Sequence, residues 1–250
     1  MKSFFITSII LFASLNIGYA QEQSSFSNYV ALDSLIVSFS LGYGFTSVGG
    51  IENYYNDLIS DYKDEGLNIS TQHNFSNTLA LEAQILFSLV YPPIWLGISG
   101  GYTFTPAFSK YEDASGEVDI NGSVDSFRIA LASKFDLCSF NKFQVFVDIK
   151  PAFSYYVAKV KDKVHFYNYS QFDLAREATL KLWIPSVEFF IGLTYPIKAF
   201  YVSFEGGYMN SFVGDQVLNV SVNGDSSQPV SELNCNQSGL IFLVSMGYGI

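Results

Sequence analysis

The chain has 250 residues, of which 13 are Lys or Arg and 23 are Asp or Glu, so its formal net charge is -10. This excess of carboxylates argues against nucleic acid as a partner. Aromatic residues make up 17% of the chain and charged residues only 14%. That composition is too aromatic for a disordered chain and too lightly charged for an ordinary soluble surface. The length fits one domain.

The first twenty residues have the features of a secretory signal peptide. Lys2 gives a basic start, residues 4–15 form an apolar run, and small residues precede the expected cleavage after Ala20. The alternative, a membrane anchor, is disfavoured because the run is shorter than the roughly 18 residues that span a bilayer. We expect a periplasmic N-terminal segment over residues 21–34 and an outer-membrane β-barrel domain over residues 35–250.

Eight segments alternate large apolar residues with small or polar ones, and a side-chain period of two is that of a β-strand. In the last segment, Phe242 and Val244 fall on one face and Ser245 and Gly247 on the other. The opposite face is mostly Gly, Ser and Ala, as in a narrow barrel interior. The segments cover about residues 35–45, 78–91, 94–104, 125–137, 143–157, 182–195, 200–208 and 239–250.

The mature chain has no apolar run of about 18 residues, so no spanning helix is expected. Only a closed barrel then pairs every backbone polar group within hydrocarbon. The sequence therefore predicts an all-β fold, an eight-stranded antiparallel up-and-down transmembrane β-barrel with long extracellular loops.

The connectors alternate in length, as in outer-membrane barrels, with short turns facing the periplasm. Short turns are expected at residues 92–93, 138–142 and 196–199, and long loops at residues 47–77, 109–124, 158–181 and 210–237. This topology places Cys138 and Cys235 at opposite ends of the barrel, so we expect no disulfide between them. Pro151 and Pro185 weaken the assignment because proline has no N–H for a strand ladder, and either could mark a strand boundary.

A ten-stranded barrel is the alternative, in which residues 166–172 and 217–222 also enter the membrane. Both segments are polar, with Asn168, Gln171 and Asn219 among their residues. Residues 217–222 precede Asn223 and Gly224, which indicates a hairpin beyond the membrane.

Outward aromatic residues collect at the two ends of the expected strands, as the aromatic girdles of a membrane barrel should. The proposed girdle comprises Tyr43, Tyr91, Tyr102, Phe135, Phe143, Tyr155, Trp183, Tyr195, Phe200, Tyr208 and Tyr248.

Together the signal peptide, the eight alternating strands, the four outer loops and the C-terminal strand make the chain resemble the small outer-membrane barrels of the OmpA transmembrane domain and OmpX type. The resemblance covers the mature chain and rests on pattern, not on a residue motif. The chain ends in Ile250 where many such barrels have an aromatic residue, and Tyr248 lies on the same face two residues earlier.

Eight strands enclose a lumen just wide enough for side chains to fill it. The inward charges form an expected lumen network of Glu82, Arg128, Lys134, Asp148, Lys150, Glu188 and Glu205. Small residues on the intervening strand leave room for Glu82 and Arg128 to meet, and Lys150 and Glu188 lie at similar depth on neighbouring strands. We interpret the charges as pairs that close the lumen, because bare buried charges are costly. A narrow proton or ion path is the alternative.

The first long loop contains one expected helix, about residues 51–63, in which Ile51, Tyr55, Leu58 and Tyr62 recur at helical spacing. This stripe either packs as a lid over the barrel mouth or forms an exposed patch for a partner or lipopolysaccharide. The first, second and fourth loops are acidic, so the outer face should repel anionic partners unless divalent cations bridge to lipopolysaccharide.

Enzyme chemistry has few candidate residues in this sequence. Its two histidines are His73 and His165, and Ser76, three residues from His73, would lie on the opposite strand face. We expect both histidines to be solvated loop residues. The histidines and cysteines have no metal-ligand spacing. We expect no catalytic site, metal or cofactor.

The sequence favours a non-enzymatic outer-membrane protein that supports the envelope or binds a partner through its loops. The alternative is a small channel or carrier for ions or hydrophobic molecules, and a lipid A-modifying enzyme is the third hypothesis. The expected partners are outer-membrane lipid, lipopolysaccharide and the barrel-assembly machinery, and the surface ligand is unknown.

Overall fold

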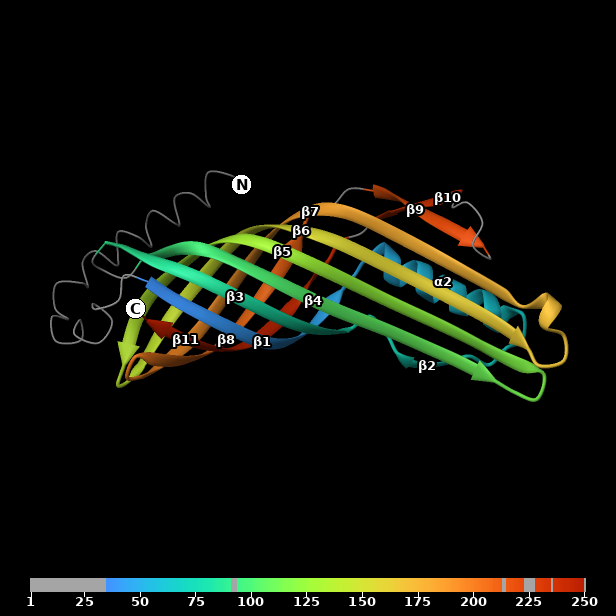
Figure 1. The fold of residues 1–250 in the computed structure, drawn as a ribbon, viewed down its shortest axis with the longest axis horizontal. Helices are drawn as coiled ribbons and strands as arrows, with labels where there is room; N and C mark the ends of the chain where they lie inside the picture. Colours follow the sequence, from blue (N-terminus) through green and yellow to red (C-terminus); the bar gives the residue numbers. More distant parts are fainter. Residues whose placement is uncertain (1–34, 91–93, 213–214, 223–227, 235, 250) are drawn as a thin grey trace.

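The computed structural model describes residues 35–90, 94–212, 215–222, 228–234 and 236–249. The expected signal peptide, residues 21–34, Tyr91 and Cys235 lie outside the described residues. Among the described residues, eight antiparallel strands form one closed ring (Figure 1). The ring strands are β1 (Leu35–Ser47), β3 (Asn77–Val90), β4 (Ile94–Glu112), β5 (Gly116–Phe140), β6 (Phe143–Phe166), β7 (Leu174–Ile197), β8 (Phe200–Ser211) and β11 (Ser238–Gly249).

The ring follows chain order, and the first and last strands close it. β1 pairs with β11 from Ile36 opposite Gly249 to Ser47 opposite Ser238. β11 in turn pairs with β8, and β8 with β7. The predicted eight-stranded antiparallel up-and-down barrel is confirmed.

Pro151 and Pro185 both lie within strands, and at each of them the ladder with one neighbouring strand is interrupted or ends. β5 and β6 pair at Ala130 opposite Ala152 and again at Ser133 opposite Ile149, with Pro151 inside the gap. Pro185 lies just beyond Ser186, where the pairing of β7 with β8 begins. Neither proline marks a strand boundary, because the missing N–H falls where a neighbouring strand does not require it.

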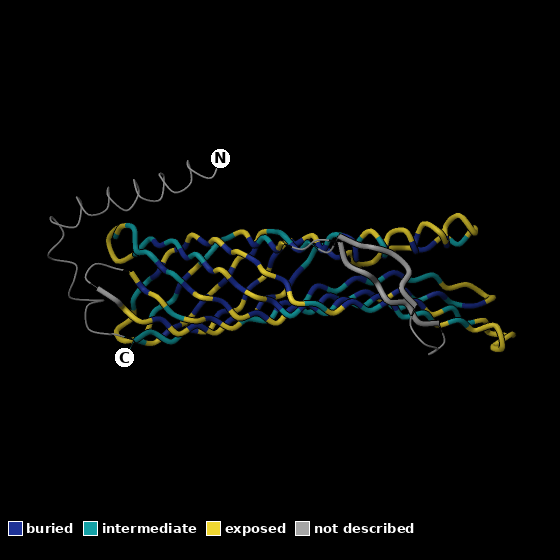
Figure 2. The backbone as a smooth tube through the Cα atoms, turned by 90° about the horizontal axis from the view of Figure 1, so that it is seen from above, coloured by how far each residue is buried: buried dark blue, intermediate teal, exposed yellow. Residues whose placement is uncertain are grey.

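Exposure alternates along the ring strands as the sequence predicted (Figure 2). Large apolar side chains point outward, with Phe39 68%, Ile129 67% and Met246 61% exposed. The inward positions next to them are buried. A closed barrel with this apolar outer surface is a transmembrane barrel of the outer-membrane type. Among the described helices, none is long and apolar enough to cross a membrane.

Two of the expected long loops are instead strand extensions. Residues 109–124 belong mostly to β4 and β5, and residues 158–181 belong mostly to β6 and β7. These four strands continue past the barrel as a sheet (Figure 1). Tyr102, Phe127, Tyr155 and Trp183 face one another across β4–β7 and form an outer aromatic row. We call the part of β4–β7 beyond this row, together with α2 (Gly50–Asp64), the outer head.

The remaining elements lie at the same end of the molecule. β2 (Ser70–His73) pairs with β4, and the hairpin of β9 (Asp215–Val222) and β10 (Gln228–Asn234) adds to β7. The expected hairpin is therefore present, and β9 continues the sheet of the outer head. The 3-10 helix η1 (Ser170–Phe172) lies in the connection between β6 and β7.

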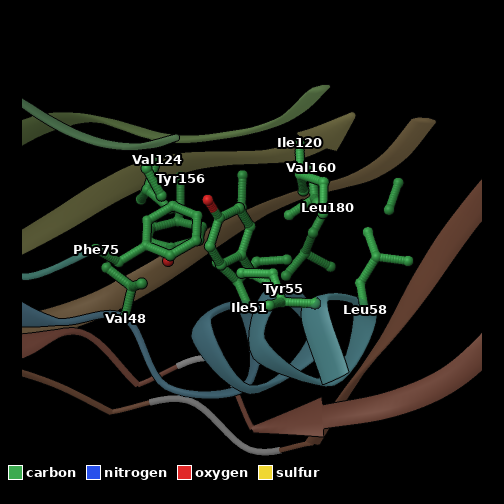
Figure 3. Packing of buried hydrophobic residues seen from close by; sticks show 14 of the residues in the cluster. Val48, Ile51, Tyr55, Leu58, Phe75, Ile120, Val124, Tyr156, Val160 and Leu180 are labelled. Atoms are coloured by element: carbon green, nitrogen blue, oxygen red, sulfur yellow. The ribbon is translucent and has the colours of Figure 1, made fainter. Parts of the chain in front are cut away.

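Helix α2 packs its apolar stripe on the sheet of the outer head (Figure 3). Ile51 and Tyr55 are fully buried and contact a core to which β5, β6 and β7 contribute Ile120, Val160 and Leu180. Helical spacing thus predicted both the helix and its buried face. The stripe is buried against this sheet and is not an exposed patch.

Turn geometry explains where α2 ends and where two strands reverse. Gly66, just beyond the helix, has a φ of 93° and its N–H donates to the carbonyl of Lys63, which is a glycine helix termination. Asn141 and Lys198 have φ of 58° and 59° in the short turns after β5 and β7. Positive φ suits the tight hairpins expected there.

Candidate functional sites in the lumen and the outer head

The lumen charges gather in one buried group. Arg128 on β5 forms ion pairs with Glu82 on β3 and with Glu188 on β7. The Lys150 ammonium lies 2.6 Å from Glu82 Oε1 and 3.3 Å from Asp148 Oδ2. All five side chains are at most 4% exposed. Two cations thus hold three carboxylates in the barrel interior.

The expected contact of Glu82 with Arg128 across β4 is present because β4 is small there. Gly101 faces Arg128 in the register of β4 with β5, and a Cβ added at Gly101 would lie 2.8 Å from the Arg128 Nε atom. Any larger residue would displace the guanidinium. Glycine at position 101 therefore makes room for the ion pair.

The expected pairing of Lys150 with Glu188 is wrong in detail. The two residues face each other in the register of β6 with β7. Among the described residues, however, Glu188 pairs with Arg128, and Lys150 pairs with Glu82 and Asp148. The long side chains reach across the lumen, which strand adjacency could not predict.

The other two expected lumen charges have different neighbours. The Lys134 ammonium lies 3.7 Å from the ring centroid of Phe146, a cation–π contact. The Ser245 hydroxyl donates a 2.9 Å hydrogen bond to Glu205 Oε1. The inward Phe146 was missed as a site residue, although its position in the alternation of β6 indicated it.

The outward aromatic residues form rows at the expected heights. Tyr102, Phe127, Tyr155 and Trp183 are consecutive partners across β4, β5, β6 and β7. At the other end, ring centroids of Phe143 and Tyr195 are 5.2 Å apart, and those of Phe200 and Tyr248 are 5.0 Å apart. Tyr43 and Tyr208 are exposed on β1 and β8, and Phe135 is half-buried on β5.

The inner face of the head also contains a buried polar cluster. The Tyr62 hydroxyl donates a 2.6 Å hydrogen bond to Asp162 Oδ2, and Arg176 Nε donates a 2.9 Å bond to the same oxygen. Burial, followed by the bond to Asp162, raises the pKa of Tyr62, so the hydroxyl stays protonated as a donor. This cluster ties the end of α2 to β6 and β7.

A cavity of about 300 Å³ opens at the far end of the head, which we call the tip cavity. Its walls come from the end of α2, the hairpin of β4 with β5 and the connection of β6 with β7. They include Tyr62, Tyr111, Glu117, His165, Phe172 and Arg176. A site at this position is open to the outside of the cell, and the sequence did not predict it because it joins three separate segments.

His165 is partly solvated, as the sequence led us to expect, but it lies in a strand and not in a loop, and it has a carboxylate partner. It lies at the end of β6, and its Nδ1 is 2.7 Å from Asp173 Oδ2. The N–H of Phe166 and then the His165 ring lower the pKa of Asp173. Ser115 lines the same cavity, but its hydroxyl donates to Asp113 Oδ1 at 2.6 Å. The arrangement supplies no activated nucleophile.

The remaining candidate residues do not come together. His73 is exposed on β2, and the Ser76 hydroxyl donates to Asn74 Oδ1 at 2.5 Å. Cys138 is a free, exposed cysteine near the end of β5. Within the described ranges, no three His, Cys, Asp or Glu residues are grouped as metal ligands.

Comparisons with known proteins find likeness only among solved structures. No family model matches the chain, and no curated protein sequence matches it. The outer-membrane protease OmpT from Escherichia coli aligns over 86% of this chain and 96% of its own, with 10% identity and a TM-score of 0.44. A major outer membrane protein from Thermus thermophilus aligns over 86% and 99%, with 12% identity and a TM-score of 0.45. Neisserial surface protein A aligns over 87% and 97%, with 9% identity and a TM-score of 0.39. A shared fold does not carry a function with it.

Proposed function

We propose that this chain is a non-enzymatic integral outer-membrane protein that acts through its outer head, with the barrel as a closed anchor. The observation that carries the proposal is the division of the molecule into a charge-filled lumen and an outer head with its own apolar core. Outer-membrane lipid and lipopolysaccharide surround such a barrel, and the barrel-assembly machinery inserts it.

The contents of the lumen support a closed barrel. Lys150 and Glu188 are fully buried, and Arg128 spans the interior between carboxylates of β3 and β7. Eight strands leave little space beyond such side chains. A conducting path would need water around these charges, and their burial argues against that water.

The outer head supports the role of a binding surface. A membrane anchor needs only strands that cross the bilayer and short connections between them. Strands β5, β6 and β7 are longer than that, with 25, 24 and 24 residues. These strands and α2 build a second core that holds the tip cavity away from the membrane. Loops positioned by a rigid scaffold are where binding sites concentrate.

Conductance through a planar lipid bilayer tests this proposal. Purified wild-type protein should give no stepwise current, and neither should Lys63→Gln, a change on the exposed side of α2 that serves as the insertion control. Sustained single-channel steps in the wild type, altered by Lys150→Met, would favour the channel hypothesis instead.

Mass spectrometry of lipid A tests the proposal that the protein is not a lipid A-modifying enzyme. Lipid A from cells with and without the protein should have the same mass profile. A loss or gain of an acyl chain that depends on the protein would replace the binding role with lipid A modification.

A further inference from the structure

We propose that the tip cavity binds a small organic cation, an alkylammonium group held between aromatic rings and carboxylates. The inference rests on the proposed function, because it names the ligand class of the outer head. It depends on three features of the cavity, which are its aromatic walls, its unbalanced carboxylates and its position at the end of a helix.

Aromatic residues from several separate segments line the cavity. Tyr111 comes from the end of β4, Phe166 from the end of β6 and Phe172 from η1. Tyr62 of α2 also lines the cavity, but the Arg176 guanidinium carbon already lies 5.7 Å from its ring centroid. Phe172 is 65% exposed although it lies far beyond the membrane. The faces of such rings attract cations.

Carboxylates around the cavity outnumber the cations that could neutralise them. The Arg176 guanidinium on the wall is paired with the buried Asp162 at 2.8 Å. Lys110 is shared between Glu112 at 3.0 Å and the wall residue Glu117 at 3.2 Å. Glu65, also on the wall, forms no ion pair within the described part of the chain. An anion would meet these carboxylates, whereas a cation would complete the charge balance.

The C-terminal end of α2 also favours a cation over an anion in the tip cavity. Glu65 is the C-cap residue of the helix, and Leu67 follows on the cavity wall. A helix C-terminus has a partial negative charge, which favours a cation nearby. The cavity volume of about 300 Å³ is at the lower end for ligand sites and suits a small molecule more than a polypeptide.

Titration calorimetry on the full-length protein in detergent micelles tests the inference. The probes are choline and its uncharged carbon isostere, in which a quaternary carbon replaces the nitrogen. Choline should bind saturably and the isostere should not, because only the charge differs. Phe172→Ala should weaken choline binding roughly 2- to 5-fold through loss of one ring face. Glu65→Gln should weaken it as well, and more strongly at low salt.

Two matched variants serve as controls. Phe140→Ala removes a phenylalanine that is 78% exposed at the end of β5, outside the cavity, and Asp57→Asn removes an exposed carboxylate of α2 outside the cavity wall. Heat-modifiable migration on a gel shows that each variant is folded. Absent choline binding, equal binding of the isostere, or equal losses in the control variants would overturn the inference. A closed barrel without choline binding would leave the proposed function standing.

Discussion

The barrel and the outer head are built from the same strands with opposite polarity. Along β6, the inward Lys150 lies in the lumen, whereas the inward Tyr156 and Val160 lie in the core of the head. Outward from the same strand, Phe153 faces lipid and Lys161 faces water. The alternation of side chains continues without a break, and the apolar residues exchange faces at the outer aromatic row.

The exchange follows from the solvent on each side. Within the membrane, hydrocarbon surrounds the barrel, so apolar side chains point outward and polar ones are enclosed. Beyond it, water surrounds the sheet, so apolar side chains turn to α2 and the hydrophobic effect holds the helix in place. The position of the exchange therefore locates the membrane boundary on each strand.

The largest effect should come from Arg128→Met, which would test whether the lumen is held by paired charges. Removal of the guanidinium leaves Glu82 and Glu188 without that partner in a buried site. We expect a loss of about 3 to 5 kcal/mol in the free energy of unfolding, measured by urea titration in lipid vesicles. The double variant with Glu188→Gln should lose less than the sum of the two single changes. Small and additive losses would mean that water screens these charges.

The core of the outer head can be weakened separately with Ile120→Ala. Ile120 is fully buried beneath α2, and its truncation should cost about 2 to 5 kcal/mol. The loss should appear as faster hydrogen exchange in α2, while the heat-modifiable migration of the barrel stays unchanged. Asn121→Ala, an exposed neighbour on the other face of β5, is the control. Equal loss of barrel stability would show that the two regions unfold as one unit.

Outward positions on β5 test where the polarity changes. Ile129→Arg places a charge in hydrocarbon and should cost about 2 to 4 kcal/mol in barrel stability. Asn121→Arg is the same kind of change on the same face of the same strand, beyond the aromatic row of Phe127. It should cost almost nothing. Similar costs at both positions would place the boundary elsewhere.

Alternation within the membrane predicted the barrel because lipid imposes one pattern on all eight strands. The same pattern identified inward charges such as Glu82 and Arg128. The extensions of β5 and β6 were assigned to loops because charged residues replaced apolar ones on the outward face. A signal was present, since Val118, Ile120 and Val124 alternate with polar residues on the inward face of β5.

The contact of Glu82 with Arg128 across β4 was expected from the sequence, but the other contacts across the lumen could not be predicted in the same way. The reach of Arg128 to Glu188 depends on the width of the lumen and on the space left by Gly101. The tip cavity depends on the lengths of two strand hairpins and on the length of α2, which bring Tyr62 close to β5 and β7. The side-chain pattern within one segment carries no information on the width of the lumen or on how close α2 lies to β5 and β7.

The smallest effect concerns the turn between β4 and β5, where the head meets bulk water. Asp113 accepts hydrogen bonds from the hydroxyls of Ser115 and Tyr111 and from the N–H groups of Ser115 and Gly116. These bonds, the Ser115 hydroxyl first, lower the pKa of Asp113 to about 2. Because the folded pKa lies below the unfolded value, the carboxylate stabilises the turn above about pH 4, and the effect is lost as the pH falls through about 2. The protection of the Ser115 and Gly116 amides from hydrogen exchange, taken relative to the intrinsic exchange rate at each pH, should therefore fall across this range in the wild type. In Asp113→Asn the protection of these amides should already be low at about pH 4 and should lack this pH dependence. The turn at Lys198, which contains no carboxylate, provides the internal reference, and the same loss of protection there would assign the change to the whole molecule instead of to Asp113.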